Sequence, residues 1–250
     1  TATEGAEFVF DQFEKDVIRV INNYDVLALT RAWNIIKGDK IVFPKKNGSV
    51  TAYIVGEGAE ITESEMVTGN ITIDIYKVAT LTELTNELLD DAMTIPELYS
   101  LLVEDVAEQV AALREDLVLG GTGSSQPRGI TATSGINSIS LAATKKVSDV
   151  TDANLVDVIT KAAKKFKRGN PVWIMSQYTY GKLMALKTTD GYPLYPELRN
   201  FSSPSLMGRR VIISDSSKIV QDLATDIALA VSIIFGDMQY FYSVNRKGTT

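Results

Sequence analysis

One amphipathic pattern, at residues 95–117, constrains the fold more than any other stretch of this sequence. Apolar residues recur there every three or four positions, as they do along one stripe of a helix. Pro96 suits the first helical turn, and the glycines that follow residue 119 are typical of a helix end leading into a flexible loop. A helix of about two dozen residues is ~35 Å long, the width of a compact domain. The predicted stripe is Leu98, Leu102, Val106, Val110, Leu113 and Leu117, with Glu97, Glu104, Glu108 and Glu115 on the other faces.

The composition limits the chemistry that this chain can perform. Its 250 residues are 45% hydrophobic, enough for a sizeable core in one large domain or two. The net charge of −6 argues against a surface built to neutralise phosphates. Without cysteine or histidine the chain lacks thiolates and the commonest general base and metal ligand. We therefore expect no catalytic, cofactor-binding or metal site, and no membrane span, since the longest apolar run, 227–235, is too short.

The first part of the chain predicts one helix and two extended arms. Residues 8–24 have helical spacing, and this helix packs either on its own domain or on a neighbouring subunit. Residues 41–43 form a short apolar run, Asn47-Gly48 is a hairpin-turn signal, and residues 50–55 resume extended sequence. Residues 71–76 alternate as in a half-buried strand. Because an isolated two-stranded ribbon is only marginally stable, we expect these arms to pack against their own domain or against another copy of the chain.

The tip between the arms, residues 56–70, is acidic and poor in large apolar residues. Its glutamates could bind a cation or act as an acid/base pair, but they lack the spacing of a calcium loop and have no histidine companion. A solvated loop or a charge-matched subunit contact is the favoured interpretation. The glycine segment 120–127 likewise follows a helix and lacks the ending of a phosphate-binding P-loop, so we interpret it as a mobile surface connection.

The second half of the chain reads as a mixed sheet covered by helices, in an α+β fold. A helix is expected from Thr151 or Asp152 to residue 165, with a basic end and a buried face of Leu155, Val158, Ile159 and Ala162. Further predicted elements are a strand at 172–175, a helix at 178–186, a loop at 190–195, and strands at 207–214, 227–234 and 238–244, the last two separated by a turn at Gly236-Asp237.

Several motifs, in their order and spacing, resemble the major capsid protein family of tailed bacteriophages. They are the tip segment 56–64, the run 76–92 containing Thr85-Asn86-Glu87-Leu88-Leu89-Asp90-Asp91, the helix exit 113–130 with Gln126-Pro127-Arg128-Gly129-Ile130, and the segments 173–176, 191–194, 206–211 and 235–237. The resemblance covers about residues 13–248. Members of this family usually continue past the equivalent of Lys247, so we expect an incomplete peripheral sheet with an exposed edge. Some members form an isopeptide crosslink from a lysine near the loop tip, where this chain has Ile61, so no crosslink is expected there.

This resemblance implies a phage major-capsid fold and a structural function. The implied parts are an N-terminal arm (1–37), an extended β-hairpin loop (38–78), a peripheral domain with a spine helix (79–146), an axial domain (147–235) and an incomplete return to the peripheral domain (236–250). Copies of the chain would form hexamers and pentamers of an icosahedral shell that encloses DNA in the virion. Scaffold, portal, protease or decoration proteins are further partners. The start at Thr1 suggests a removed scaffolding segment. The alternatives are an encapsulin nanocompartment and, more remotely, a carboxylate-dependent hydrolase.

Overall fold

The computed structural model divides into two compact units. It describes residues 25–35, 38–52, 54–58, 63–80, 96–141, 146–162, 169–227 and 230–246. Unit 1 holds the described residues up to Arg31 and those of Val78–Ser243, and unit 2 holds those of Ala32–Lys77 and from Val244 onward. Four predicted features lie outside the described residues: the helix at 8–24, the motif at 85–91, the crosslink position Ile61 and the basic segment 163–168.

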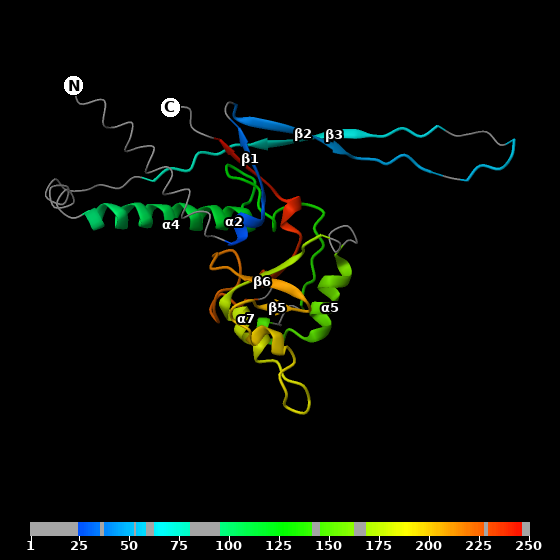
Figure 1. Ribbon diagram of the computed structural model, residues 1–250. Coiled ribbons are helices and arrows are strands. Elements are labelled where there is room, and N and C mark those ends of the chain that lie inside the picture. The colour runs from blue at the N-terminus through cyan, green and yellow to red at the C-terminus, as the bar shows by residue number, and fades with distance from the viewer. Residues whose placement is uncertain are drawn as a thin grey trace, which may run out of the picture. The chain divides into compact units, whose positions relative to one another are not determined.

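Unit 1 is built on a mixed four-stranded sheet, as predicted from the sequence. Its strands are ordered β5-β6-β4-β7, and Figure 1 labels β5 and β6. The central strand β4 runs parallel to β6 and antiparallel to β7, while β5 and β6 are antiparallel neighbours. The bounds are β4 Val172–Met175, β5 Ser205–Leu206, β6 Arg209–Ile213 and β7 Ile233–Gly236.

Helices cover both faces of this sheet, because side chains alternate between the faces of a strand. On one face Trp173, Met175 and Val211 pack against buried residues from α5 (Asp152–Lys161), α7 (Gln177–Met184) and η2 (Pro196–Arg199), namely Leu155, Tyr180, Leu183 and Leu198. On the other face Val172, Ile174 and Ile212 pack against α2 (Asp25–Leu29), α4 (Pro96–Gly120) and η3 (Met238–Tyr240), through Val26, Leu119 and Met238. The prediction of a helix-covered sheet is confirmed.

The helix bounds near the sheet follow local capping interactions. The backbone N–H of Thr151 donates to Oδ1 of Asn154 at 3.0 Å, which fixes the start of α5. Before α7, Oγ of Ser176 accepts from the N–H of Thr179 at 3.2 Å. A short helix, η1 (Val147–Asp149), precedes α5.

Tyr195 connects the loop after α7 to the start of α5. Its hydroxyl donates to Oδ1 of Asp152. Burial, followed by this hydrogen bond, raises the pKa of Tyr195 above its ordinary value. A raised folded-state pKa means that the stabilisation is present below the unfolded pKa of about 10 and is lost as pH rises through the folded value.

We expect Tyr195→Phe to lower the free energy of unfolding by about 1 kcal/mol at pH 7. This deficit should shrink above pH ~10 in urea titrations followed by circular dichroism; a deficit independent of pH would contradict this role.

The long helix α4 forms as predicted, but its buried face differs from the predicted stripe. Ala107, Ala111, Glu115 and Leu119 are buried, whereas Leu113 is 46% exposed. The prediction placed Leu113 in the core stripe and Glu115 on the polar face, and both assignments are wrong. Alanines let a helix approach its neighbour closely. The two buried alanines are four residues apart and lie on the helix surface next to the leucine stripe. The periodicity of apolar residues therefore did not identify which of these two sides is buried.

The glycine segment after α4, predicted to be a flexible surface connection, is closed by backbone hydrogen bonds; we call residues 120–129 the clasp. The N–H of Gly121 donates to the carbonyl of Leu117 at 3.0 Å, and the N–H of Gly129 donates to that of Gly121 at 2.7 Å. Thr122 and Arg128 form an antiparallel bridge. A Cβ built on Gly121 would lie 2.2 Å from the carbonyl oxygen of Pro127, so only glycine fits there.

We therefore expect Gly121→Ala to destabilise unit 1 by about 1–3 kcal/mol, because the clasp must open to admit the methyl group. The matched control is Gly181→Ala in α7, where a Cβ would meet nothing within 4 Å. That change should stabilise the protein by roughly 0.5–1 kcal/mol, since alanine loses less conformational freedom in a helix. Urea unfolding of both variants checks this; equal effects would contradict the clasp.

The C-terminal strands differ from their predicted positions. β7 begins only at Ile233, and Ile227, at the start of the predicted strand 227–234, is 64% exposed. Met238–Tyr240, at the start of the predicted strand 238–244, forms η3. Oδ1 of Asp237 accepts from the N–H of Gln239 at 3.0 Å, and this local cap competes with strand formation. The following strand, β8 (Tyr242–Arg246), pairs with β1 (Arg31–Ile35) and is not part of the four-stranded sheet.

Unit 2 contains an antiparallel ribbon of β2 (Lys40–Lys46) and β3 (Thr68–Asp74) (Figure 1). Its register pairs Lys40 with Asp74 at one end and Lys46 with Thr68 at the other. The predicted hairpin turn at Asn47-Gly48 is therefore wrong, because the partner of residues 40–46 lies more than twenty residues further on. The described residues of 50–55 form no strand.

Candidate functional site

The β2–β3 ribbon has one apolar face. Ile41 lies opposite Ile73, and Phe43 lies opposite Ile71, so the alternation of side chains puts all four on the same side. We call these four residues the apolar ribbon face. The other side carries Val42 opposite Thr72 and Lys40 opposite Asp74. This amphipathic pattern is that of a strand pair that packs against something on one side only.

Within the described part of unit 2, the aromatic residue that packs on this face is Trp33 of β1. The ring centroids of Trp33 and Phe43 are 5.4 Å apart, in an edge-to-face arrangement. Ile71 remains 46% exposed and Trp33 40% exposed. A two-stranded ribbon of this kind is marginal in water. The apolar ribbon face is therefore only partly covered by the described residues.

Two ion pairs lie at the end of the ribbon that is away from the tip. Nζ of Lys40 is 3.3 Å from Oδ1 of Asp74. Nη1 of Arg246, on β8, donates to Oδ1 of Asp39 at 2.8 Å. Both pairs are solvent-exposed and contribute little to stability. The Lys40–Asp74 pair joins two residues that the ribbon register places opposite each other.

The described residues of the tip are mostly solvent-exposed, and exposed apolar side chains lie in the tip and just before it. The N–H of Thr51 donates to Oγ of Ser64 at 3.2 Å, so the two sides of the tip remain connected beyond the paired strands. Glu57, Glu63 and Glu65 are exposed. In the described ranges of the chain, no group of acidic residues could hold a metal ion. Exposed large apolar residues accompany them, namely Val50, Ile54, Val55, Met66 and Val67.

Unit 1 contains an acidic pair that the sequence pattern does not indicate, a buried Glu115 and a partly exposed Asp116, which we call the acidic anchor. Glu115 and Asp116 lie near the C-terminal end of α4, where the helix dipole disfavours negative charge. Oε1 of Glu115 accepts from the hydroxyl of Ser214 at 2.5 Å. Asp116 accepts from the hydroxyl of Ser216 and from the N–H of Ser217, the latter at 2.9 Å. These serines follow β6, so the anchor connects the long helix to the sheet.

We expect Glu115→Ala to lower the free energy of unfolding by about 2 kcal/mol, because the buried Ser214 hydroxyl loses its acceptor. Glu115→Gln keeps an acceptor oxygen and should cost less. The control Glu108→Ala changes an exposed glutamate of the same helix and should stay within about 0.5 kcal/mol of the parent. Urea titrations compare the three; an effect of Glu115→Ala no larger than that of Glu108→Ala would contradict the anchor.

Another buried carboxylate, Asp226, is also engaged in a structural role. Its Oδ1 accepts from the N–H of Val147 at 2.9 Å, and its Oδ2 accepts from the hydroxyl of Tyr178 at 3.3 Å. Burial and the nearby charge of Asp226 raise the pKa of Tyr178. Glu115 and Asp226 thus bind different partners on different elements. These hydrogen bonds satisfy the buried carboxylates of Glu115 and Asp226, and the two carboxylates do not face each other as a catalytic pair would.

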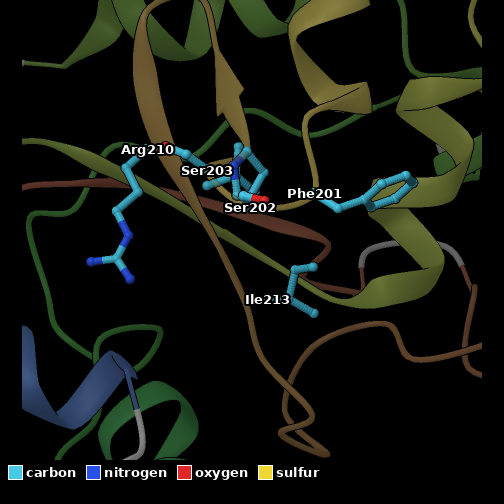
Figure 2. Close-up of a pocket in the computed structure, with 7 residues that line it drawn as sticks. Phe201, Ser202, Ser203, Arg210 and Ile213 are labelled. Atoms are coloured by element: carbon cyan, nitrogen blue, oxygen red, sulfur yellow. The ribbon is translucent and has the colours of Figure 1, made fainter.

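An open depression of about 480 Å³ lies at the β5–β6 edge of unit 1. Figure 2 shows Phe201 and Arg210 on opposite sides of Ser202 and Ser203, with Ile213 nearby. None of its lining residues is a carboxylate, so it does not supply the acid and base that the hydrolase alternative needs. Across the part of the chain that the structure describes, none of the helices has the length and hydrophobicity of a transmembrane span.

Comparison with solved structures identifies a fold shared with the capsids of GTA particles and with a structure from a phage. The capsid of an empty GTA particle matches with a TM-score of 0.72 and 18% identity, over 90% of this chain and 77% of that chain. The capsid of the native GTA particle gives 0.70 and 20% identity, over 86% and 74%. A structure from Gordonia phage Cozz gives 0.59 and 20% identity, over 86% and 69%. At these identities the likeness establishes the fold.

The family assignment comes from the sequence itself. No curated protein matches the chain. The family model described as the phage capsid family matches residues 5–250, almost the whole sequence. The chain therefore belongs to the phage capsid family and is a structural capsid protein.

Proposed function

We propose that copies of this chain assemble through hexamers and pentamers into an icosahedral shell that encloses viral DNA, and that the apolar ribbon face is one of the surfaces joining neighbouring copies. The observation that carries this proposal is the exposure of Ile71 and Trp33 on a ribbon too small to be stable alone. Contacts of this kind repeat in every subunit, so a modest free energy per contact suffices for a stable shell.

The proposed parts of the capsid subunit are those expected from the sequence. Residues 1–37 act as the N-terminal arm, 38–78 as the extended loop, 79–146 as the peripheral domain with α4 as its spine, 147–235 as the axial domain and 236–250 as the return. The net charge of −6 supports enclosure of DNA without sequence-specific binding, since a strongly basic interior would hinder packing and release. We also propose that the chain assembles in the host cytoplasm and that its further partners are scaffold, portal, protease or decoration proteins. The same proposal gives the chain no enzymatic activity.

Light scattering coupled to size-exclusion chromatography tests the proposal on the purified chain. We expect a uniform particle of many subunits, or rings that convert to it as protein concentration rises. Electron micrographs of the same fractions should show closed shells. A strictly monomeric chain at all salt and protein concentrations would overturn the proposal. Nuclease-protected DNA inside particles made during infection would favour a virion, whereas an enclosed enzyme would favour the encapsulin alternative.

A further inference from the structure

The dipeptide Asn47-Gly48 follows β2 directly and, although its sequence is typical of a hairpin turn, it does not form one. Asn47 is exposed to solvent. We propose that Asn47-Gly48 is a site of spontaneous covalent modification, at which the asparagine side chain converts to aspartate or isoaspartate, and that the closed end of the β2–β3 ribbon slows the reaction.

The reaction needs only the dipeptide and water. The backbone nitrogen of Gly48 attacks Cγ of Asn47, a new C–N bond closes a five-membered succinimide, and the Cγ–Nδ2 bond breaks. Ammonia leaves with the proton that Gly48 gives up. Water then opens the ring at either carbonyl, its hydroxyl going to carbon and its proton to nitrogen, which yields aspartate or isoaspartate. Nothing is oxidised or reduced. Glycine favours the attack because it places no Cβ beside the nucleophilic nitrogen.

The structure shows how the ribbon restrains both reacting groups. The N–H groups of Asn47 and Gly48 both donate to the carbonyl of Val67, at 2.8 and 3.1 Å. The side-chain amide of Asn47 lies over Gly69, where an added Cβ would come within 2.3 Å of Nδ2 and 3.1 Å of Cγ. The attacking nitrogen is thus hydrogen-bonded and the amide is packed on the opposite strand. Reaction requires local opening of the last ribbon pair, Lys46 and Thr68.

The product would alter the boundary between the ribbon and the tip. Either product adds a negative charge next to a tip that already carries Glu57, Glu63 and Glu65. Isoaspartate also adds one methylene to the main chain just after β2, which moves the N–H of Gly48 relative to the carbonyl of Val67. A chain converted to isoaspartate therefore does not re-form the original backbone geometry at this end of the ribbon.

Peptide mapping by mass spectrometry tests the site on the full chain. Samples are incubated at one neutral pH and one temperature, in native buffer and in guanidinium chloride. We expect Asn47 to convert in both, and roughly two- to tenfold more slowly in native buffer, the factor that one hydrogen bond supplies. Asn70 is the matched control, since it lies on the same ribbon but precedes the branched Ile71 and should stay unmodified. Phe43→Ala loosens the ribbon and should bring the native rate close to the unfolded one.

Two results would overturn the inference. Conversion of Asn47 no faster than that of Asn70 in the unfolded chain would refute the site. Equal rates for Asn47 in native and unfolded chains, with the ribbon shown to be formed by amide exchange, would refute control by the ribbon. Neither result depends on shell assembly, so the inference stands or falls apart from the proposed function.

Discussion

Phe43→Asp abolishes particle formation while leaving the four-stranded sheet of unit 1 folded: this is the largest functional effect we expect. The substitution puts a charge in the middle of the apolar ribbon face, opposite Ile71. Burying an unpaired carboxylate in an apolar contact is strongly unfavourable. Aromatic anchors in interfaces are worth about 2 kcal/mol or more each, a factor of about thirty in affinity per contact, and every subunit repeats the contact.

The matched control is Val42→Asp. Val42 is the preceding residue on the same strand, is exposed, and faces the opposite side of the ribbon. It carries the same charge change without entering the apolar ribbon face. Ile71→Asp serves as a second test variant, because Phe43 also contacts Trp33 and its loss could loosen the ribbon. Light scattering should give particles for Val42→Asp and small species for the other two. Particles of normal size from both Phe43→Asp and Ile71→Asp would contradict the assigned interface.

Trp173→Ala should cause the largest loss of stability, about 3–5 kcal/mol, because it empties the centre of the sheet core. Trp173 is fully buried on β4, its ring centroid lies 4.3 Å from that of Phe235, and its Nε1 donates to the carbonyl of Leu206 at 3.0 Å. The substitution removes the packing and leaves the Leu206 carbonyl without this donor. A loss of this size is a large part of the stability of an ordinary domain.

Two variants separate these contributions in urea titrations followed by circular dichroism. Trp173→Phe keeps an aromatic ring but removes the N–H donor, so it should fall between the parent and Trp173→Ala. Phe201→Ala removes an aromatic side chain that is 73% exposed, and should stay within about 0.5 kcal/mol of the parent. A loss for Trp173→Ala similar to that for Phe201→Ala would show that Trp173 is not the centre of the core.

The strands and helices with strong local signals could be predicted from the sequence. The buried run of β4 is bounded by Pro171 and by Ser176, which caps the next helix, so local sequence determines both ends. The long helix α4 was likewise expected from its periodicity. Its buried face was not, because Ala107 and Ala111 are less hydrophobic than the neighbouring leucines but allow closer packing.

Features that depend on distant partners could not be predicted. Asn47-Gly48 is a strong local turn signal, yet the alternating patterns of β2 and β3 pair across the intervening tip, and this long-range register prevails. Glu115 looked like a surface residue because nothing in its local sequence indicates Ser214, which lies ninety-nine positions away. The apolar ribbon face was foreseen only in part, as extended arms that need a partner.

A cryo-electron microscopy map of the assembled particle tests the central claim most directly, because it shows what covers the apolar ribbon face. We predict that Phe43 and Ile71 of each subunit are buried against a neighbouring copy of the chain. A map in which these side chains face solvent, or are covered only by residues of their own chain, would contradict the proposed assembly.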